Sequence, residues 1–243
     1  MTSRILGAAF LLQAVSSLIS GTIVSGIIVS GKSGQSLINI ANNRILIGAD
    51  VLLEMATAIG VIFLGWVLFV ALRKESEKSS IIAFGMYIVE GALVAVNSLA
   101  AYSLLSVAQK YITSGSSESL ANGSSILQTM SFSLTLSLLP FGVGAIIFYF
   151  LLYKSRIGPR PLSLWGLLTA PLVLIGTVLG LLGHSVPNFI YYPYAPFEFV
   201  IGAWILIKGA KVKVATLLMR PTHLQGSSTT LEKASVPLEI GCP

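Results

Sequence analysis

The sequence predicts an all-α membrane protein, a bundle of six transmembrane helices. Two observations carry this prediction. First, 54% of the 243 residues are hydrophobic and only 10% are charged, with a mean hydropathy of +0.87, whereas about one quarter of the residues of a soluble domain are charged. Second, apolar stretches of about 20 residues recur along the chain, which is the length that a helix needs to cross about 30 Å of hydrocarbon.

Six apolar stretches are the predicted spans, and residues 1–208 are the predicted transmembrane domain. The spans are expected at 5–29, 47–72, 81–105, 126–153, 164–182 and 190–207. The first begins like a signal peptide after Arg4, but it is too long for a typical signal-peptide core. Segments 31–46 and 114–125 are rich in Gly, Ser and Asn, which predicts flexible links. Pro140 is expected to kink the fourth span.

The placement of Lys and Arg predicts that both termini are cytoplasmic, because cytoplasmic loops are enriched in these residues. With the N-terminus inside, twelve of the 15 basic residues fall on the cytoplasmic side. The three in outer loops are Lys32, Arg44 and Lys110. Residues 209–243 form the predicted cytoplasmic tail, which is first basic, as suits a surface of anionic headgroups, and then polar and largely disordered.

Composition also limits the function classes. The net charge of +6 does not indicate nucleic-acid binding, because the basic residues lie in short loops and the tail; the expected partner is the lipid bilayer. Cys242 is the single cysteine, so neither a disulfide nor a cysteine metal site can form. The spans hold no nucleophile–base–acid set, so an enzyme is not favoured. No cofactor and no oligomeric state follow from the sequence.

Four acidic residues lie in apolar segments that contain no Lys or Arg: Asp50, Glu54, Glu90 and Glu198. Each would cost roughly 2.5–3.5 kcal/mol at the centre of a membrane helix. Asp50 is expected to be a solvated acid in the first turn of its helix, where the helix dipole favours it. Glu54, four residues on, shares its face and lies about 10 Å deeper.

Glu90 has the least ordinary placement of the four. It falls about 16 Å into its span, near the midplane of the membrane, and Asn97 lies on the same helix face. At that depth a glutamate must be protonated, paired with a donor or hydrated in a cavity. The alternative is a neutral glutamate that hydrogen-bonds to another helix and serves packing.

Glu198 depends on where the last helix begins and ends, since Pro193 and Pro196 interrupt the segment before it. If the helix ends near Lys208, Glu198 lies about 15 Å deep at the start of a half-helix, an arrangement that marks binding sites in some transporters. If the helix continues past Lys208, Glu198 is shallow. The aromatic loop 183–196 is either an interfacial anchor or a lid over a cavity.

Together these residues predict a proton or cation site formed by Glu54, Glu90, Asn97 and Glu198. No Lys or Arg in the spans can neutralise the acids, so they would share protons or bind a cation. Polar faces on the first span (Gln13, Ser17 and Ser20) and on the fourth (Gln128, Ser131 and Thr135) serve packing or line a pore. The functions that follow are a transporter or channel for protons, cations or small solutes, a non-catalytic sensor or assembly protein, or an enzyme with a carboxylate-bound metal.

Several stretches also resemble a known family. They are the segments 4–10, 153–166 and 193–209, together with the residues around Glu54 and Glu90. They are similar to a prokaryotic integral membrane family catalogued as domain of unknown function 4386. The resemblance implies six helices and the cell membrane of a prokaryote, and it brings no reaction, ligand or catalytic residue.

Overall fold

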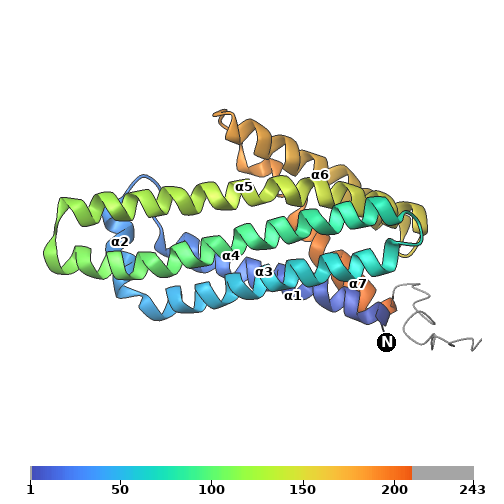
Figure 1. Cartoon of the computed structure of the whole chain (residues 1–243), viewed down its shortest axis with the longest axis horizontal. Coiled ribbons are helices and arrows are strands. Elements are labelled where there is room, and N and C mark those ends of the chain that lie inside the picture. The colour runs from blue at the N-terminus through green and yellow to red at the C-terminus, as the bar shows by residue number, and fades with distance from the viewer. Residues whose placement is uncertain (1, 210–243) are drawn as a thin grey trace, which may run out of the picture. The chain divides into compact units, whose positions relative to one another are not determined.

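A computed structural model describes residues 2–209, and this part of the chain consists of helices joined by short links, without a strand. The order of the elements is shown in Figure 1. They are α1 (Thr2–Ile27), α2 (Ser33–Asn42), α3 (Arg44–Leu72), α4 (Glu77–Ser114), α5 (Ser117–Ser155), α6 (Arg160–Leu181), the 3₁₀ turn η1 (Asn188–Ile190) and α7 (Ala195–Lys208).

Six helical segments of the described chain are long and apolar enough to cross a membrane: α1, α3, α4, α5, α6 and the segment Asn188–Lys208 that contains α7. The predicted all-α fold with six spans is therefore confirmed, and the chain is a multi-pass membrane protein. The predicted tail, residues 209–243, lies outside the described residues except for Gly209.

The two loops predicted to be flexible are largely helical, so that prediction was wrong. Segment 114–125 belongs mostly to α4 and α5, and only Gly115 and Ser116 join the two helices. Gly115 permits the tight turn with φ at +60°, and the Ser116 side chain caps α5 by accepting a hydrogen bond from the Ser119 N–H. A small flexible residue and a hydroxyl are common in loops, but here they are a helix C-cap and N-cap.

Most of segment 31–46 forms α2, a short amphipathic helix. Its apolar residues Leu37, Ile40 and Ala41 lie three to four residues apart and are buried, as expected for one helical face. α2 packs against α4 and α5, and the Leu37 side chain lies against Gly123. α4 has 38 residues and is about 57 Å long at 1.5 Å per residue, well beyond a 30 Å hydrocarbon layer.

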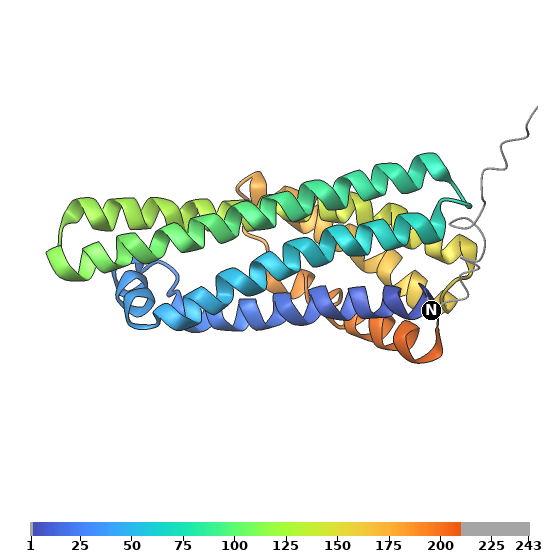
Figure 2. The ribbon, with the colours of Figure 1, turned by 60° about the horizontal axis from the view of Figure 1, so that its bottom comes forward.

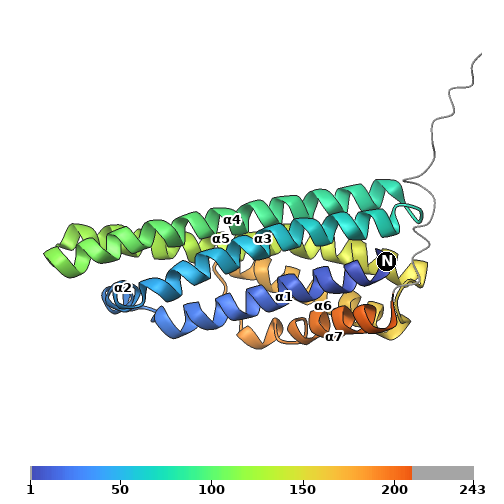
Figure 3. The same cartoon turned by 90° about the horizontal axis from the view of Figure 1, so that it is seen from below.

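The helices form a sequence of neighbours in which α1 packs on α3, α3 on α4, α4 on α5 and α5 on α6. α7 lies along α1 (Figures 2 and 3) and touches α6 only weakly. Among these described helices, no Cα of α1 lies within 8 Å of a Cα of α4 or α5. α1 and α5 are therefore not directly packed neighbours in the described chain.

The two ends of the bundle differ. At one end, here called the basic end, lie the start of α1, the links α3–α4 and α5–α6, and the end of α7 (Figure 1). This end carries the basic residues Arg4, Arg73, Lys74, Lys78, Lys154, Arg156, Arg160 and Lys208. At the other, the hairpin end, lie α2 and the α4–α5 turn (Figure 1). That the basic end is cytoplasmic stays a prediction from the loop charges.

α1 and α7 approach closely because glycines face each other at their contact. A Cβ on Gly7 would lie 2.7 Å from the carbonyl oxygen of Gly202, and it would also meet the backbone of Leu206. A Cβ on Gly202 would lie 3.0 Å from the Leu11 side chain. Small residues of this kind let membrane helices approach each other.

We expect Gly7→Ala to destabilise the protein, because the added methyl group meets backbone atoms that cannot move aside without separating α1 from α7. Overpacking of this kind costs about 1–3 kcal/mol, so thermal unfolding in detergent should shift to lower temperature. Gly21→Ala is the matched control on the same helix, since nothing lies within 4 Å of its Cβ position. Equal stability of the two variants would contradict the close contact.

Candidate functional site

A cavity of about 340 Å³ lies among α1, α3, α4 and α5. Its polar lining consists of Gln13, Ser17, Ser20, Glu54, Thr57, Glu90, Thr135 and Ser137, and its apolar lining of Gly21, Val24, Val61, Val94, Leu134 and Leu138. The cavity has room for several water molecules. Two carboxyl groups and no Lys or Arg line it.

Glu54 reaches the cavity from α3 and is held by α4. The Asn97 side-chain Nδ2 donates to both carboxyl oxygens of Glu54, at 2.7 and 2.9 Å, and Ser98 Oγ donates at 3.4 Å. Glu54 and Asn97 are 6% and 0% exposed. Asn97 therefore fixes the orientation of Glu54 between the two helices, while its own Oδ1 is buried without a hydrogen-bond partner.

Asp50 is buried, so its prediction as a solvated surface acid was wrong. α3 begins at Arg44, earlier than expected, which moves Asp50 into the second turn and against α1. Its side chain is 1% exposed, and Ser20 Oγ donates to Oδ1 at 2.6 Å. The other oxygen, Oδ2, is buried without a partner. One turn along, Ser16 and Thr57 make a second hydroxyl contact between the same helices at 2.8 Å.

Glu90 faces the cavity from the first half of α4 and is the least satisfied group of its lining. Its Oε2 is buried and has no hydrogen-bond partner. Asn97, expected to support Glu90 from the same helix face, instead bonds to Glu54. Glu198 of α7 lies near enough to Glu90 for the two carboxylates to repel each other when both are charged. Glu90 therefore lacks the hydrogen-bond donor that is expected for a glutamate that serves helix packing.

Glu198 lies in the first turn of α7 and is reached by a chain of hydroxyl groups. Tyr194 OH donates to Glu198 Oε1 at 2.7 Å, and the hydroxyls of Tyr149 and Tyr194 are 2.6 Å apart. The Gln13 side chain of the cavity wall is within hydrogen-bonding reach of Glu198. α7 ends at Lys208, where Gly209 has φ of +75°, which favours the deep placement of Glu198 at the start of a half-helix.

Aromatic rings hold the start of α7 in place. The Tyr194 ring packs edge-on against Phe141, with centroids 5.0 Å apart, and the Phe197 ring packs edge-on against Tyr149 at 4.9 Å. Trp165 Nε1 donates to the carbonyl oxygen of Pro193 at 2.9 Å. These contacts join α7 to α5 and α6, although the backbones of α6 and α7 touch only weakly.

The chain matches one known protein family. The model of the family described as domain of unknown function (DUF4386) matches residues 5–209. The chain belongs to this family. No curated protein and no solved structure matches it. The family match covers all six spans, so the cavity and every residue of the candidate site lie inside the family domain.

In this DUF4386 member the structure brings the predicted site residues together unequally. Glu54 and Asn97 bond directly, Glu54 and Glu90 line one cavity, and Glu198 lies outside the lining but near Gln13 of the cavity wall. Sequence reasoning did not include Asp50 or the tyrosines in the site. The spacing of Asp50 and Glu54 could have indicated the first, because residues four apart share a helix face.

No sequence pattern indicated that the tyrosines belong to the site or which residues on the polar face of α5 line the cavity. Tyr149 lies in an apolar aromatic run that is typical of any membrane helix. On α5, Thr135 lines the cavity as the pore alternative expected, but Gln128 and Ser131 are exposed on the helix surface. Pro140 lies inside the continuous helix α5.

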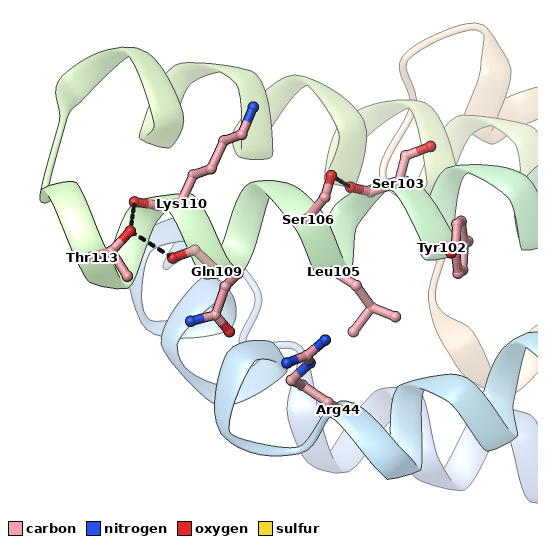
Figure 4. Close-up of a pocket in the computed structure, with 8 residues that line it drawn as sticks. All are labelled: Arg44, Tyr102, Ser103, Leu105, Ser106, Gln109, Lys110 and Thr113. Atoms are coloured by element: carbon pink, nitrogen blue, oxygen red, sulfur yellow. Dashed lines mark hydrogen bonds between the residues drawn. The ribbon is translucent and has the colours of Figure 1, made fainter.

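A second hollow lies at the hairpin end between α3 and α4 and carries two basic residues, Arg44 and Lys110 (Figure 4). Both are exposed, and Figure 4 shows the Lys110 side chain pointing away from Arg44. The nearby hydroxyls of Ser103, Ser106 and Thr113 donate to carbonyls of their own helix. The two positive charges therefore do not converge on a common ligand.

The loop 183–194 does not cover the cavity. None of its residues lines the cavity, and the Tyr191 hydroxyl packs against Gly176 of α6. Phe189 and Tyr192 are each 66% exposed. These exposures favour the interfacial anchor over the lid, since aromatic side chains prefer the membrane–water interface. His184 of this loop is also exposed and belongs to no cluster.

We expect Asn97→Leu to destabilise the protein by about 1–3 kcal/mol, because it leaves the buried Glu54 carboxyl without its main donor. The double variant Asn97→Leu with Glu54→Leu should recover much of this loss, since replacing both partners by apolar groups removes the unsatisfied group. Thermal unfolding of wild type, both single variants and the double variant in detergent measures the coupling. Additive losses would show that the two side chains do not interact.

Proposed function

We propose that this protein is a small transporter or channel-like protein that handles protons or small cations at the cavity between α1, α3, α4 and α5. One observation carries the proposal: Glu54 and Glu90 face the same intramembrane cavity, and no basic residue lines it. The lining is therefore suited to a positively charged species.

The physical argument concerns charge balance. Removing a carboxylate from water costs several kcal/mol unless a positive partner compensates it. Hydrogen bonds from Asn97 and Ser98 offset part of that cost at Glu54, whereas Glu90 Oε2 has no donor. A proton or a cation in the cavity would supply the missing positive charge. Glu90 is thus the group whose charge depends most on whether a proton or a cation occupies the cavity.

The hydrogen-bonded chain of Tyr149, Tyr194 and Glu198 supports the exchange of protons between the cavity and the basic end. Glu198 lies near Gln13 of the cavity wall, and hydrogen bonds run from Glu198 through Tyr194 to Tyr149. Hydroxyl and carboxyl groups in hydrogen-bond contact can pass a proton along such a chain, and intramembrane acids commonly mark such relays. A route from the cavity toward the basic end would pass these residues.

The sensor or assembly role is the second candidate, and the α4–α5 hairpin favours it. These helices have 38 and 39 residues and extend well past the length that a bilayer requires, so a surface outside the hydrocarbon is available to a partner. The metal enzyme has no support: among residues 2–209 no group of three or more His, Cys, Asp and Glu side chains is placed to hold a metal ion.

The test is transport by the purified full chain in liposomes. Proton uptake is followed with an enclosed pH-sensitive dye, and sodium and potassium uptake with radioactive tracers. We expect uptake of at least one of these ions, and at least a tenfold loss in Glu90→Gln, which keeps the size of the side chain but cannot carry the charge.

The control is Glu118→Gln, the same substitution at an exposed acid in the first turn of α5, which should transport like the wild type. Unchanged proton and cation uptake in Glu90→Gln would reject the proposal. The sensor or assembly role predicts that result, together with a stable complex whose formation does not depend on Glu90.

A further inference from the structure

The cavity has a side opening because α7 is short. Pro196 lies in the first turn of α7, where a proline is tolerated, and together with Pro193 it stops the helix from extending toward its N-terminus. The 14 residues of α7 give a helix of about 21 Å, which is less than the 30 Å of hydrocarbon. Part of the space between α1 and α5 is therefore not filled by α7.

The contacts of α1 show which part stays open. α7 runs antiparallel to α1: Gly7 meets Leu206 and Gly202, and Leu11 meets Gly202. Gln13 reaches Glu198 near the start of α7. Residues of α1 beyond this point lie past the end of α7, and Ser17 and Gly21 among them are exposed and line the cavity.

The contacts of α5 indicate that the same part of the space stays open. Tyr149 and Phe141 both touch Tyr194, the residue before α7. Leu134 and Thr135 lie about two turns before Phe141, toward the hairpin end, and they also line the cavity. No Cα of α1 lies within 8 Å of a Cα of α5 in the described chain. We call the opening between Ser17 and Gly21 on α1 and Leu134 and Thr135 on α5 the window.

We propose that the cavity binds a small organic amine, with a positive nitrogen and an apolar body, which reaches it from the bilayer through the window. This inference rests on the proposed function and names its substrate class. Glu54 and Glu90 select the positive nitrogen, since a carboxylate binds an ammonium group by charge and hydrogen bonds. Beside the window the apolar side chains of Leu18 and Phe132 are 56% and 57% exposed, as expected for a surface that faces hydrocarbon.

The rest of the lining matches an apolar body. Val61, Val94, Leu134 and Leu138 contribute hydrocarbon surface next to the two acids, and burying apolar area is worth about 25 cal/mol per Å². The volume of about 340 Å³ lies in the range of small-molecule sites, about 300–1,000 Å³. Access from the bilayer suits an amine, which can cross hydrocarbon as its uncharged base.

Other occupants use only part of this lining. An inorganic cation gains nothing from the four apolar side chains, and a lipid tail would leave the carboxyl groups unpaired. An anion would meet two acids with no basic residue to offset them. An apolar amine satisfies the acids and the hydrocarbon surface together.

The experiment measures binding of radiolabelled benzylamine to the full chain in nanodiscs, with empty nanodiscs subtracted. Benzyl alcohol, which has the same ring without the charge, and methylammonium, which has the charge without the ring, serve as competitors. We expect saturable benzylamine binding, no competition by benzyl alcohol, and competition by methylammonium that is at least tenfold weaker than that of unlabelled benzylamine. Saturable binding that benzyl alcohol displaces equally well, or no saturable binding, overturns the inference.

The window is tested by Ser17→Trp and Leu134→Trp, which narrow it from opposite sides and should each slow the association of benzylamine at least tenfold. Thr22→Trp is the matched control, since Thr22 is exposed on α1 and does not line the cavity. Variants are used only if they elute as a single species in size-exclusion chromatography. Wild-type association rates for benzylamine in both window variants overturn access through the window.

The two proposals fail in different ways. Glu90-dependent proton or cation uptake without benzylamine binding rejects the amine and leaves the proposed function standing. Wild-type uptake in Glu90→Gln rejects the proposed function, whatever the benzylamine result.

Discussion

The balance of charge inside the bundle is the constraint on which the rest of the site depends. Asp50, Glu54, Glu90 and Glu198 lie on three helices, and the cavity that Glu54 and Glu90 share has no basic residue in its lining. Buried carboxylates without positive partners are costly. The protein meets this cost with neutral donors: Ser20 for Asp50, Asn97 and Ser98 for Glu54, and Tyr194 for Glu198. Only Glu90 has no such donor.

That pattern separates two roles for the acids. Asp50 and Glu54 connect α3 to α1 and α4 through hydrogen bonds, so both contribute to helix packing, and Glu54 also lines the cavity. Glu90 contributes no such bond, and its Oε2 is buried without a partner. A residue that satisfies its polar group through packing needs no ligand, whereas one that does not is a stronger functional candidate. The acids are distinguished by their hydrogen-bond partners and not by their depth in the membrane.

The short final helix links the local chemistry to the shape of the site. Two prolines, the aromatic contacts of Tyr194 and Phe197, and the close α1–α7 contact at Gly7 and Gly202 fix where α7 begins and how near it lies to α1. The same features fix the edge of the window that faces the basic end, and they place Glu198 near Gln13. A helix that continued along α1 on the N-terminal side of Ala195 would fill the window.

The sequence by itself determined the six spans, the family and the candidates Glu54, Glu90, Asn97 and Glu198, because hydrophobic length and misplaced charge are local properties of the chain. It did not reveal α2, the extended α4–α5 hairpin or the burial of Asp50, since each depends on a partner helix that covers a polar or short segment. Only the tertiary structure decided that Asn97 serves Glu54 rather than Glu90. Helix periodicity shows which residues share a face, but the neighbouring helices decide what that face meets.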